Sequence, residues 1–375
     1  MEKILSVVLN PFVNDNRVLK EAQSLSSFGY KVTVLALHEN ELKTNETIRD
    51  IKVIRVPLIT KLLPKWKVIQ FFKYIELIVR VVFTQFRHAD VVHCHDLNAL
   101  PIGILFKLLS FNTKKVIYDA HEYETEVYGL SKVEKKLRFY LEGLLIRYAE
   151  ETITVSDSIA REYSSLYEMN KPKLILNCPA FTKQRKSDLF REELKIREDQ
   201  IIFLYQGGFS SGRGIEILLE TFSNLDSDNI VIVFMGYGPL DKLVQSKADS
   251  ENSIFYRSAV GHEVLLNYTS SADYGILFYE DTCLNHRYCS PNKIFEYLMA
   301  GLPVLTSNLF EMKRLVEQEG VGVVADTNTV DGFKKAIDAS LRLEYTSVQK
   351  NVFSAREKYC WEEQEKVLQE IYDEL

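Results

Sequence analysis

Short apolar runs alternate with amphipathic segments along the whole chain. In the first half, the runs that predict buried strands are 4–9, 31–37, 51–56, 91–95, 115–118 and 152–155. Segment 16–28 places Val18, Ala22 and Leu25 on one face, which predicts a helix that ends at Gly29. Apolar strands that alternate with such helices are typical of a parallel sheet covered on both faces. Right-handed crossovers then make the sheet doubly wound.

The alternation stops near residue 178 and then starts again. Segment 182–200 is polar and charged, and the strand runs that follow it are 201–205, 230–235, 254–256, 274–278, 304–306 and 321–324. We therefore expect an α/β protein with two Rossmann-like domains, residues 1–177 and 178–360. The last helix, 361–375, is expected to pack back on the first domain. Ligands bind at the carboxyl ends of such strands, so we expect the two sheets to face each other across a cleft.

Composition narrows the class of protein. The chain of 375 residues is 46% hydrophobic and 26% charged, which is typical of a globular protein. A formal charge of −6 argues against general nucleic-acid binding. Five cysteines without a CxxC pair favour a reducing compartment. The chain has no apolar run of eighteen residues, and its first residues resemble a strand more than a signal peptide. We therefore expect a cytoplasmic location.

Residues 290–307, SPNKIFEYLMAGLPVLTS, combine helix signals with chemistry. Ser290 is expected to cap a helix whose first residue is Pro291 and which Gly301 closes. Asn292 and Glu296 lie four apart and share one face, with Lys293 beside them. A helix start suits a phosphate, and the Glu296 carboxylate one turn later suits ribose hydroxyls. The alternative is a capped amphipathic helix with ordinary surface charges.

Two glycine-containing loops follow predicted strands. The loop 206–214, QGGFSSGRG, lets backbone N–H groups approach an anion at Gly207 and Gly208, and Arg213 adds a positive charge. The alternative is a flexible surface turn with a solvated arginine. The loop 235–240, with Gly236 and Gly238, predicts either the wall of a base or ribose pocket or a tight turn before a helix.

Histidine and carboxylate side chains end two predicted strands of the first half. The sequences are His93-Cys94-His95-Asp96 and Tyr118-Asp119-Ala120-His121-Glu122. His121 could donate to a sugar hydroxyl or a phosphate oxygen, and a structural role for the histidines stays open. A third loop, 10–17, includes Asn14 and Asp15 and lacks the glycine fingerprint of a dinucleotide site.

Two groups of residues resemble metal-binding motifs but do not predict a metal site. Cys283, His286 and Cys289 lack a fourth ligand at standard spacing. Asp226 and Asp228 form a D-x-D between a helix and a strand, where turn-forming aspartates explain them better. We expect no metal site and no cofactor.

Segment 61–87 is basic and aromatic. Its basic residues outnumber a single acid, Glu76. They are Lys61, Lys65, Lys67, Lys73, Arg80 and Arg87. Aromatic residues such as Trp66, Phe71, Phe72 and Phe83 are interleaved with them. Such a helix suits an anionic membrane surface, and the alternative is a core-packing helix whose charges face water.

Taken together, the motifs resemble the family 4 glycosyltransferases of GT-B fold, and in particular members with an SPNK-type helix. The motifs, in order, are DNRVLKEAQSL, VVHCHD, VIYDAHEYETE, ITVSDSIA, LILNCP, YQGG…RG, GYGPL, SPNKIFEYLMAGLPV and WEEQEKVLQEIY. This family implies a retaining, metal-independent transfer of a hexosyl type of sugar from a nucleotide sugar, such as a UDP- or GDP-sugar, to an acceptor hydroxyl. It also implies that the first domain binds the acceptor and the second the donor.

The resemblance assigns roles to particular residues. Arg213 would bind the diphosphate and Glu296 the ribose, with Gly207, Gly208, Gly236 and Gly238 in the donor-binding loops. Ser290, Pro291, Asn292 and Lys293 would lie near the diphosphate and the transferred sugar. His121 would contact the sugar, and the expected catalytic residues are His121, Arg213, Lys293 and Glu296. On the acceptor side we expect Asn14, Asp15, His95, Asp96 and Glu122.

The chain departs from the family pattern in two places. Segment 207–212 lacks an arginine that many members carry, and Tyr288 replaces the first of two glutamates spaced eight apart. The leading hypothesis is a transferase for a bacterial surface or secreted polysaccharide, with a glycan or lipid-linked acceptor at the inner face of the membrane. The alternatives are a catalytically silent scaffold of the same fold and, less favoured, a nucleotide-sugar epimerase.

Overall fold

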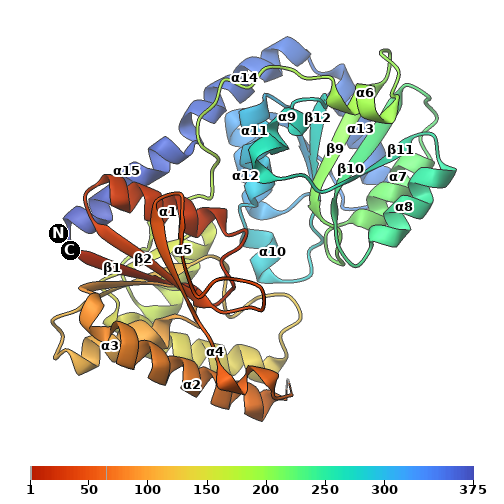
Figure 1. Ribbon diagram of the computed structural model, residues 1–375. Coiled ribbons are helices and arrows are strands. Elements are labelled where there is room, and N and C mark those ends of the chain that lie inside the picture. The colour runs from red at the N-terminus through yellow and green to blue at the C-terminus, as the bar shows by residue number, and fades with distance from the viewer. Residues whose placement is uncertain (1, 65) are drawn as a thin grey trace. The chain divides into compact units, whose positions relative to one another are not determined.

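The computed structural model describes residues 2–64 and 66–375 and divides into two compact units. The first comprises Met1–Ile175 and Glu365–Leu375, and the second comprises Leu176–Gln364. Figure 1 shows each unit as a sheet covered by helices on both faces. Two parallel-sheet α/β units of this kind confirm the predicted fold class. The division lies between residues 175 and 176, two residues before the predicted one.

The N-terminal unit is built on a sheet in the order β3-β4-β2-β1-β5-β6-β7-β8. Neighbouring strands are parallel except β3 and β4. The strands are β1 (Lys3–Val7), β2 (Lys31–Leu37), β3 (Asn45–Ile48), β4 (Ile51–Val56), β5 (Val91–His95), β6 (Lys115–Ala120), β7 (Glu151–Thr154) and β8 (Lys173–Leu174).

Strand β3 was not predicted. Its sequence NETI is polar, so it carries no apolar run, and it pairs antiparallel with β4 across a two-residue turn. Both turn residues, Arg49 and Asp50, have positive φ, of 45° and 69°. Two such residues match the twist of a hairpin, and this turn lacks the Asn-Gly pair that usually marks it.

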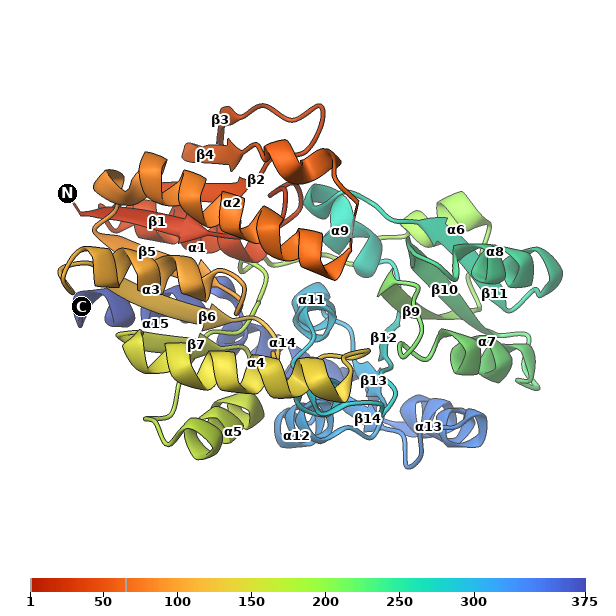
Figure 2. The same ribbon diagram turned by 90° about the horizontal axis from the view of Figure 1, so that it is seen from below.

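Helices of the N-terminal unit cover the sheet from both sides. They are α1 (Asn16–Ser27), α2 (Lys67–Gln85), α3 (Leu100–Leu109), α4 (Lys132–Leu145), α5 (Asp157–Tyr167) and most of α15 (Trp361–Asp373). Helices α2, α3 and α4 lie on one face, while α1 and α15 lie on the other (Figures 1 and 2). Ser24 of α1 donates to Glu365 of α15 at 2.6 Å. The Asp15 carboxylate caps α1 by accepting from the Val18 amide.

The C-terminal unit is built on a six-stranded parallel sheet in the order β11-β10-β9-β12-β13-β14. Its strands are β9 (Ile201–Gly208), β10 (Ile230–Tyr237), β11 (Ile254–Ser258), β12 (Tyr274–Leu277), β13 (Val304–Thr306) and β14 (Gly322–Val324). Its helices are α6 (Leu189–Leu194), α7 (Ile215–Ser223), α8 (Asp241–Ser250), α9 (His262–Thr269), α10 (Leu284–Tyr288), α11 (Asn292–Ala300), α12 (Phe310–Glu319), α13 (Val330–Arg342) and α14 (Tyr345–Lys358). Aromatic side chains such as Phe203, Tyr205 and Phe234 fill its core.

The start of α11 corrects one prediction. Pro291, not Ser290, occupies the cap position, and the cap makes no side-chain hydrogen bond. Pro291 has an extended backbone, with φ −66° and ψ 137°, so the helix begins one residue later at Asn292. The predicted end is confirmed, because Gly301 adopts a left-handed φ of 85° as the C-cap. Helix α11 therefore opens toward the carboxyl end of the sheet with the segment Ser290–Asn292.

Candidate functional site

The glycine-rich loop at the end of β9 lies tightly against the end of β10. A Cβ atom on Gly236 would lie 1.9 Å from the carbonyl oxygen of Gly207, and one on Gly238 would lie 2.4 Å from that of Phe209. Gly207 also has a φ of +121°, which side chains rarely tolerate. Glycine is therefore required at these positions for the two strand ends to meet. The backbone of the loop is left accessible at Gly208, which is exposed.

Two cations from different elements meet beside this loop. The Arg213 guanidinium, from the end of this loop two residues before α7, lies 4.1 Å from the centre of the Tyr279 ring. The Lys293 ammonium, from α11, lies 4.2 Å from the Tyr205 ring centre and 5.6 Å from that of Tyr279. A Cβ on Gly207 would lie 3.2 Å from Lys293 Nζ, so the lysine lies directly over the loop backbone. The structure thus brings together Gly207, Arg213 and Lys293, and their role in binding a donor stays a prediction.

The electrostatics of this pair favour an anion. In the part of the chain that the structure describes, neither Arg213 nor Lys293 forms an ion pair with a carboxylate; both stack on aromatic rings. Burial, and then the neighbouring Arg213 charge, lower the pKa of Lys293 to about 7, although Glu296 acts in the opposite direction. An anion bound between the two side chains would reverse this shift. The site therefore has two neighbouring cations with no carboxylate in ion-pair contact among the described residues.

Gln206 holds the Glu296 carboxylate in place. Its side-chain amide donates to Glu296 Oε2 at 2.5 Å and accepts from the Thr269 hydroxyl at 2.8 Å. Its backbone N–H donates to the Tyr297 hydroxyl, which itself donates to carbonyl groups of β9 and β12. Glu296 is thus oriented by the sheet itself. Sequence reasoning gave Gln206 no role, although its place at the end of β9 was a usable signal.

Other predicted donor residues lie at and before the start of α11. Asn292 is exposed, Ser290 is half-buried and Pro291 is buried at the start of α11. Tyr288, which stands where the family pattern has a glutamate, packs edge-on against Phe310 with ring centres 6.2 Å apart. Its ring is held by an apolar contact that a carboxylate could not make.

The histidine of the predicted Cys-His-Cys group has other partners. The Cys283 sulfur accepts from the His286 amide at 3.5 Å, and the Cys289 thiol donates to the His286 carbonyl at 3.3 Å. His286 Nδ1 lies 2.9 Å from the Thr282 hydroxyl. These side chains tie the short helix α10 together through local hydrogen bonds.

In the N-terminal unit, a buried ionic network lies behind His121. The Arg17 guanidinium, from α1, donates to both oxygens of Asp119 at 2.9 to 3.1 Å. Asp119 Oδ2 lies 3.0 Å from His121 Nε2. Burial raises the pKa of Asp119, but Arg17 and His121 lower it more, so this carboxyl titrates well below its ordinary range. Burial lowers the pKa of His121, yet Asp119 and Asp96 outweigh it and raise the value to about 9. His121 is therefore protonated at neutral pH.

Two further histidines belong to this network rather than to the surface. His95, predicted on the acceptor side, is 2% exposed and lies 2.8 Å from the Ser6 hydroxyl and 3.1 Å from His121. His93 is 1% exposed and lies 3.0 Å from the Tyr372 hydroxyl of α15. His95 is therefore buried beneath α1 and α15, and its predicted place on the acceptor side stays a prediction. His95 contacts His121 from the buried side of the network.

Four groups in this network are close enough to ligate a metal ion. They are Glu21, His93, His95 and Asp119, whose ligand atoms lie within 4.8 Å of one another. However, Arg17 contacts both carboxylates, with Nε 3.0 Å from Glu21 Oε1. A divalent cation would lie beside this guanidinium and the protonated His121. Arg17 and His121 already balance the two carboxylates, and burial followed by repulsion from Asp119 raises the pKa of Glu21 to about 7. We therefore assign no metal here.

The remaining acceptor-side residues lie after the ends of β5 and β6 or in the loop between β1 and α1. Asp96 has a left-handed φ of 64° and accepts from the His121 backbone N–H at 3.1 Å. Asp15 caps α1 and accepts from the Asn10 side chain at 2.8 Å. Asn14 and Glu122 are exposed. The structure thus brings His95, Asp96 and His121 together, whereas Asp15 serves the helix start.

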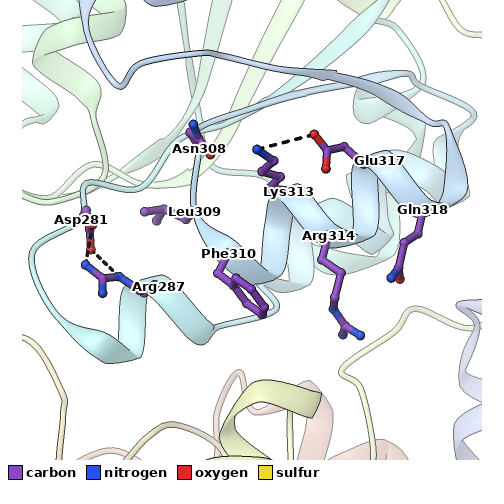
Figure 3. A pocket seen from close by; sticks show the side chains of 9 residues that line it. All are labelled: Asp281, Arg287, Asn308, Leu309, Phe310, Lys313, Arg314, Glu317 and Gln318. Carbon is purple, nitrogen blue, oxygen red and sulfur yellow. Dashed lines mark hydrogen bonds and ion pairs between the residues drawn. The ribbon is translucent and has the colours of Figure 1, made fainter.

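A pocket of about 570 Å³ lies elsewhere in the C-terminal unit, between α10 and α12 (Figure 3). Its charged side chains are neutralised in pairs: Arg287 with Asp281 at 2.7 Å, and Lys313 with Glu317 at 3.8 Å. Arg314, also in its lining, pairs with Glu311. This pocket therefore lacks the unbalanced charge of the Arg213 and Lys293 site, which we regard as the better candidate.

Two family models match the chain. Residues 16–178 match the family model Glycosyltransferase Family 4, and residues 200–342 match the model Glycosyl transferases group 1. No curated protein sequence matches the chain.

Solved structures resemble the chain over its whole length at low sequence identity. Sucrose-phosphate synthase from Thermosynechococcus elongatus has a TM-score of 0.81 at 16% identity, covering 100% of this chain and 99% of its own. Anabaena Alr3699/HepE in complex with UDP and glucose has a TM-score of 0.75 at 14% identity, covering 100% of both chains. The catalytic domain of starch synthase IV from Arabidopsis thaliana, bound to ADP and acarbose, has a TM-score of 0.71 at 10% identity, covering 100% and 99%. Each half of the chain thus matches a glycosyltransferase family model, and the whole chain shares its fold with these solved structures.

Proposed function

We propose that this protein transfers a sugar from a nucleoside diphosphate sugar to an acceptor hydroxyl, with retention of the anomeric configuration. The observation that carries the proposal is the pair of cations without carboxylate partners, Arg213 and Lys293, over the glycine loop of β9. Their counter-charge is the diphosphate of the donor. The Anabaena structure in complex with UDP and glucose supports this proposal, because it shares the fold.

The geometry of the C-terminal unit suits the departure of a nucleoside diphosphate. Arg213, Lys293 and the first N–H groups of α11 converge on one region, and Glu296 is held one turn into the same helix. We propose that Glu296 binds the ribose hydroxyls, with Gly236 and Gly238 at the wall of the nucleoside pocket. Ser290, Pro291 and Asn292 would line the path of the diphosphate and the sugar.

The chemistry follows from where charge develops. As the bond between the anomeric carbon and the donor phosphate oxygen breaks, negative charge grows on the diphosphate. Arg213 and Lys293 are fixed donors that stabilise this charge more in the transition state than in the ground state. The acceptor oxygen then bonds to the anomeric carbon from the same face, and its proton passes to the leaving phosphate oxygen. This step needs no metal, because protein cations carry the charge stabilisation.

The N-terminal unit is proposed to bind the acceptor and the sugar. His121 is protonated and 19% exposed, so it can donate to a sugar hydroxyl. Asp96 and Glu122 lie at the same strand ends. We propose a glycan or lipid-linked acceptor in polysaccharide assembly at the inner face of a bacterial membrane, with residues 61–87 contacting that surface. No described helix is long and apolar enough to cross a bilayer.

A donor panel tests the proposal. Calorimetry with UDP- and GDP-sugars should detect binding, and slow donor hydrolysis should appear without any acceptor. Proton NMR of the first product formed should show the anomer of the donor. Absence of binding across the panel would overturn the proposed donor site, and the opposite anomer would overturn retention.

A catalytically silent scaffold is the second candidate, and Tyr288 favours it. The Tyr288 ring packs on Phe310 in the place where many family members have a carboxylate. Comparison of the wild type with Arg213→Ala and Glu296→Ala separates the two candidates. Equal transfer rates in all three proteins would support the scaffold and exclude catalysis at this site. Formation of a new nucleotide sugar without acceptor would indicate an epimerase.

A further inference from the structure

An apolar stripe runs along the outer side of α2. Val68, Phe72, Ile75, Val79 and Phe83 are all exposed, with Phe83 at 85%. Their spacing of four, three, four and four residues places them on one side of a helix. A stripe of this kind on a globular protein normally packs on a core, yet here Leu77 and Val81 pack inward and the stripe faces out. Trp66, Leu62 and Phe71 extend the exposed apolar area.

Helix α4 repeats the pattern. Its exposed apolar residues have the same spacing of four, three, four and four residues. They are Val133, Leu137, Tyr140, Leu144 and Tyr148. Tyr148 lies in the short turn that follows the helix. The inward side of α4 carries Glu142, which accepts hydrogen bonds from Tyr118, Tyr163 and Tyr167. Sequence reasoning singled out segment 61–87 and gave α4 no role. Two apolar stripes are therefore present in the N-terminal unit.

The two stripes lie on the same side of one sheet. Helix α3 contacts both α2 and α4, and all three lie on one face of the sheet (Figures 1 and 2). The end of α3 adds Leu108, Leu109 and the 93% exposed Phe111. Single exposed apolar residues are common on protein surfaces, but here they come from three neighbouring helices. A contiguous apolar area of this kind marks a contact surface.

The charge of this face has the opposite sign to that of the whole chain. The chain has a formal charge of −6, yet segment 59–88 has six basic residues and one acidic residue, and segment 132–148 has five and two. One of those acids, Glu142, is buried, and Glu76 accepts backbone hydrogen bonds from residues 59 and 60. The exposed cations of this face include Lys61, Arg87, Lys132, Lys136 and Arg147. Lys65 lies outside the described residues, and the side chain of Lys67 is not described.

We propose that the outer face of α2, α3 and α4 is a docking surface for an anionic lipid bilayer, with both stripes inserted at the headgroup level. The inference rests on the proposed contact of residues 61–87 and adds α4 and the end of α3 as its second half. Apolar side chains enter the boundary of the acyl chains, while lysine and arginine side chains meet the anionic headgroups. Two helices in contact hold the unit on the membrane more firmly than one.

A second copy of this chain fits the face less well. Docking two copies through it would bring basic segments against basic segments, and such like-charge contacts disfavour association. An anionic surface supplies the complementary charge. Self-association remains an outcome that the experiment can detect.

Vesicle sedimentation tests the proposal on the full chain. Vesicles of phosphatidylcholine with one third phosphatidylglycerol should retain the protein, whereas pure phosphatidylcholine should retain much less. The variant Leu137→Ser/Leu144→Ser on α4 should weaken binding by about thirtyfold or more, because each buried leucine contributes strongly. The variant Phe71→Ser/Phe72→Ser on α2 should act similarly. Lys132→Glu/Lys136→Glu should weaken binding by about tenfold or more and reduce its salt dependence.

A matched control comes from the C-terminal unit. Leu243→Ser/Leu343→Ser changes two leucines of 39% and 38% exposure outside the face and should leave vesicle binding unchanged. If the α4 variants bind vesicles like the wild type while the α2 variant does not, α4 has no part in docking and the proposal is wrong. A dimer in sedimentation that dissociates in the α4 variant would also overturn it, in favour of a second copy. Hydrolysis of a soluble donor should be the same in all surface variants, so loss of vesicle binding is separable from failure of the proposed reaction.

Discussion

The two units concentrate charge in opposite ways. In the N-terminal unit, Arg17 contacts Asp119 and Glu21, and Asp119 contacts His121, so the buried charges are matched within the protein. In the C-terminal unit, Arg213 and Lys293 lie over aromatic rings, beside a glycine loop, without a carboxylate in ion-pair contact among the described residues. Most charges of the first cluster are paired within the protein, whereas the two cations of the second have no carboxylate in ion-pair contact among the described residues.

This difference separates a stabilising cluster from a binding cluster. Buried charges that lack partners destabilise a fold, so a protein keeps them where a ligand supplies the partner. Burial and the neighbouring Arg213 lower the pKa of Lys293, as expected for a cation without an opposite charge in contact. In the N-terminal cluster, mutual pairing keeps Asp119 ionised and His121 protonated. Mutations in the first cluster should therefore reduce stability, and mutations in the second should reduce activity.

The largest expected effect is on catalysis at Arg213. Arg213→Ala should lower kcat/KM for sugar transfer by about 10²–10³-fold, as for other fixed donors to a developing negative charge. The free energy of unfolding should change by less than about 0.5 kcal/mol, because no carboxylate loses its partner. Steady-state kinetics and urea unfolding measure the two quantities. Arg287→Ala, which removes a guanidinium paired with exposed Asp281, is the control and should leave transfer intact.

The next effect is on the stability of the N-terminal unit. Asp119→Asn should lower the free energy of unfolding by about 3 kcal/mol, because it leaves the buried Arg17 guanidinium without its main partner. Urea unfolding, with hydrogen exchange of β5 and β6 to assign the loss to this unit, measures the change. Asp281→Asn breaks an exposed pair and should cost less than about 0.5 kcal/mol. An equally small loss at Asp119 would show that the two clusters do not differ as argued.

Much of this contrast was visible in the sequence, but unequally in the two clusters. Gly207 and Arg213 lie at and after the end of β9, while Lys293 and Glu296 lie in the first turns of α11, and the topology of a parallel sheet brings strand ends and the starts of the following helices to one edge. Their meeting was therefore predictable from local signals alone. The rings of Tyr205 and Tyr279, which hold the two cations, were not predictable, because aromatic residues at strand ends usually indicate a core.

The N-terminal cluster was harder to predict. Arg17 and Glu21 lie on the same helical face as Val18 and Leu25, and charged residues on a buried face were a signal that sequence reasoning did not use. The burial of His95 was missed, because a histidine at a strand end was expected to face a ligand although helices were expected on both faces of the sheet. The cap at Ser290 was misassigned by one residue, which is the ordinary uncertainty of a helix end.

A smaller effect is the pH dependence of donor binding through Lys293. In the protein without ligand, the pKa of Lys293 is about 7. A bound diphosphate should raise this pKa. Between the pKa of the unliganded protein and that of the complex, the complex therefore holds up to one proton more. Affinity should be constant below pH 7 and fall by up to about tenfold per pH unit above it. Calorimetry with a nucleotide sugar, whose diphosphate does not titrate in this range, measures this slope. Lys293→Arg should flatten the profile, and a wild-type profile that is flat from pH 6 to 9 would refute the role of Lys293.

The smallest effect separates the nucleoside from the diphosphate at the same site. Glu296→Gln keeps the shape of the side chain that Gln206 orients but removes its charge, so hydrogen bonds from the ribose hydroxyls should weaken. Affinity for a nucleoside diphosphate should fall by about tenfold, as expected for one charge-assisted hydrogen bond. Affinity for inorganic pyrophosphate should stay the same or rise slightly, because a nearby negative charge is lost. If both ligands weaken equally, Glu296 supports the shape of the whole pocket and does not read the ribose; if only the nucleotide weakens, the cations and the carboxylate bind different parts of one donor.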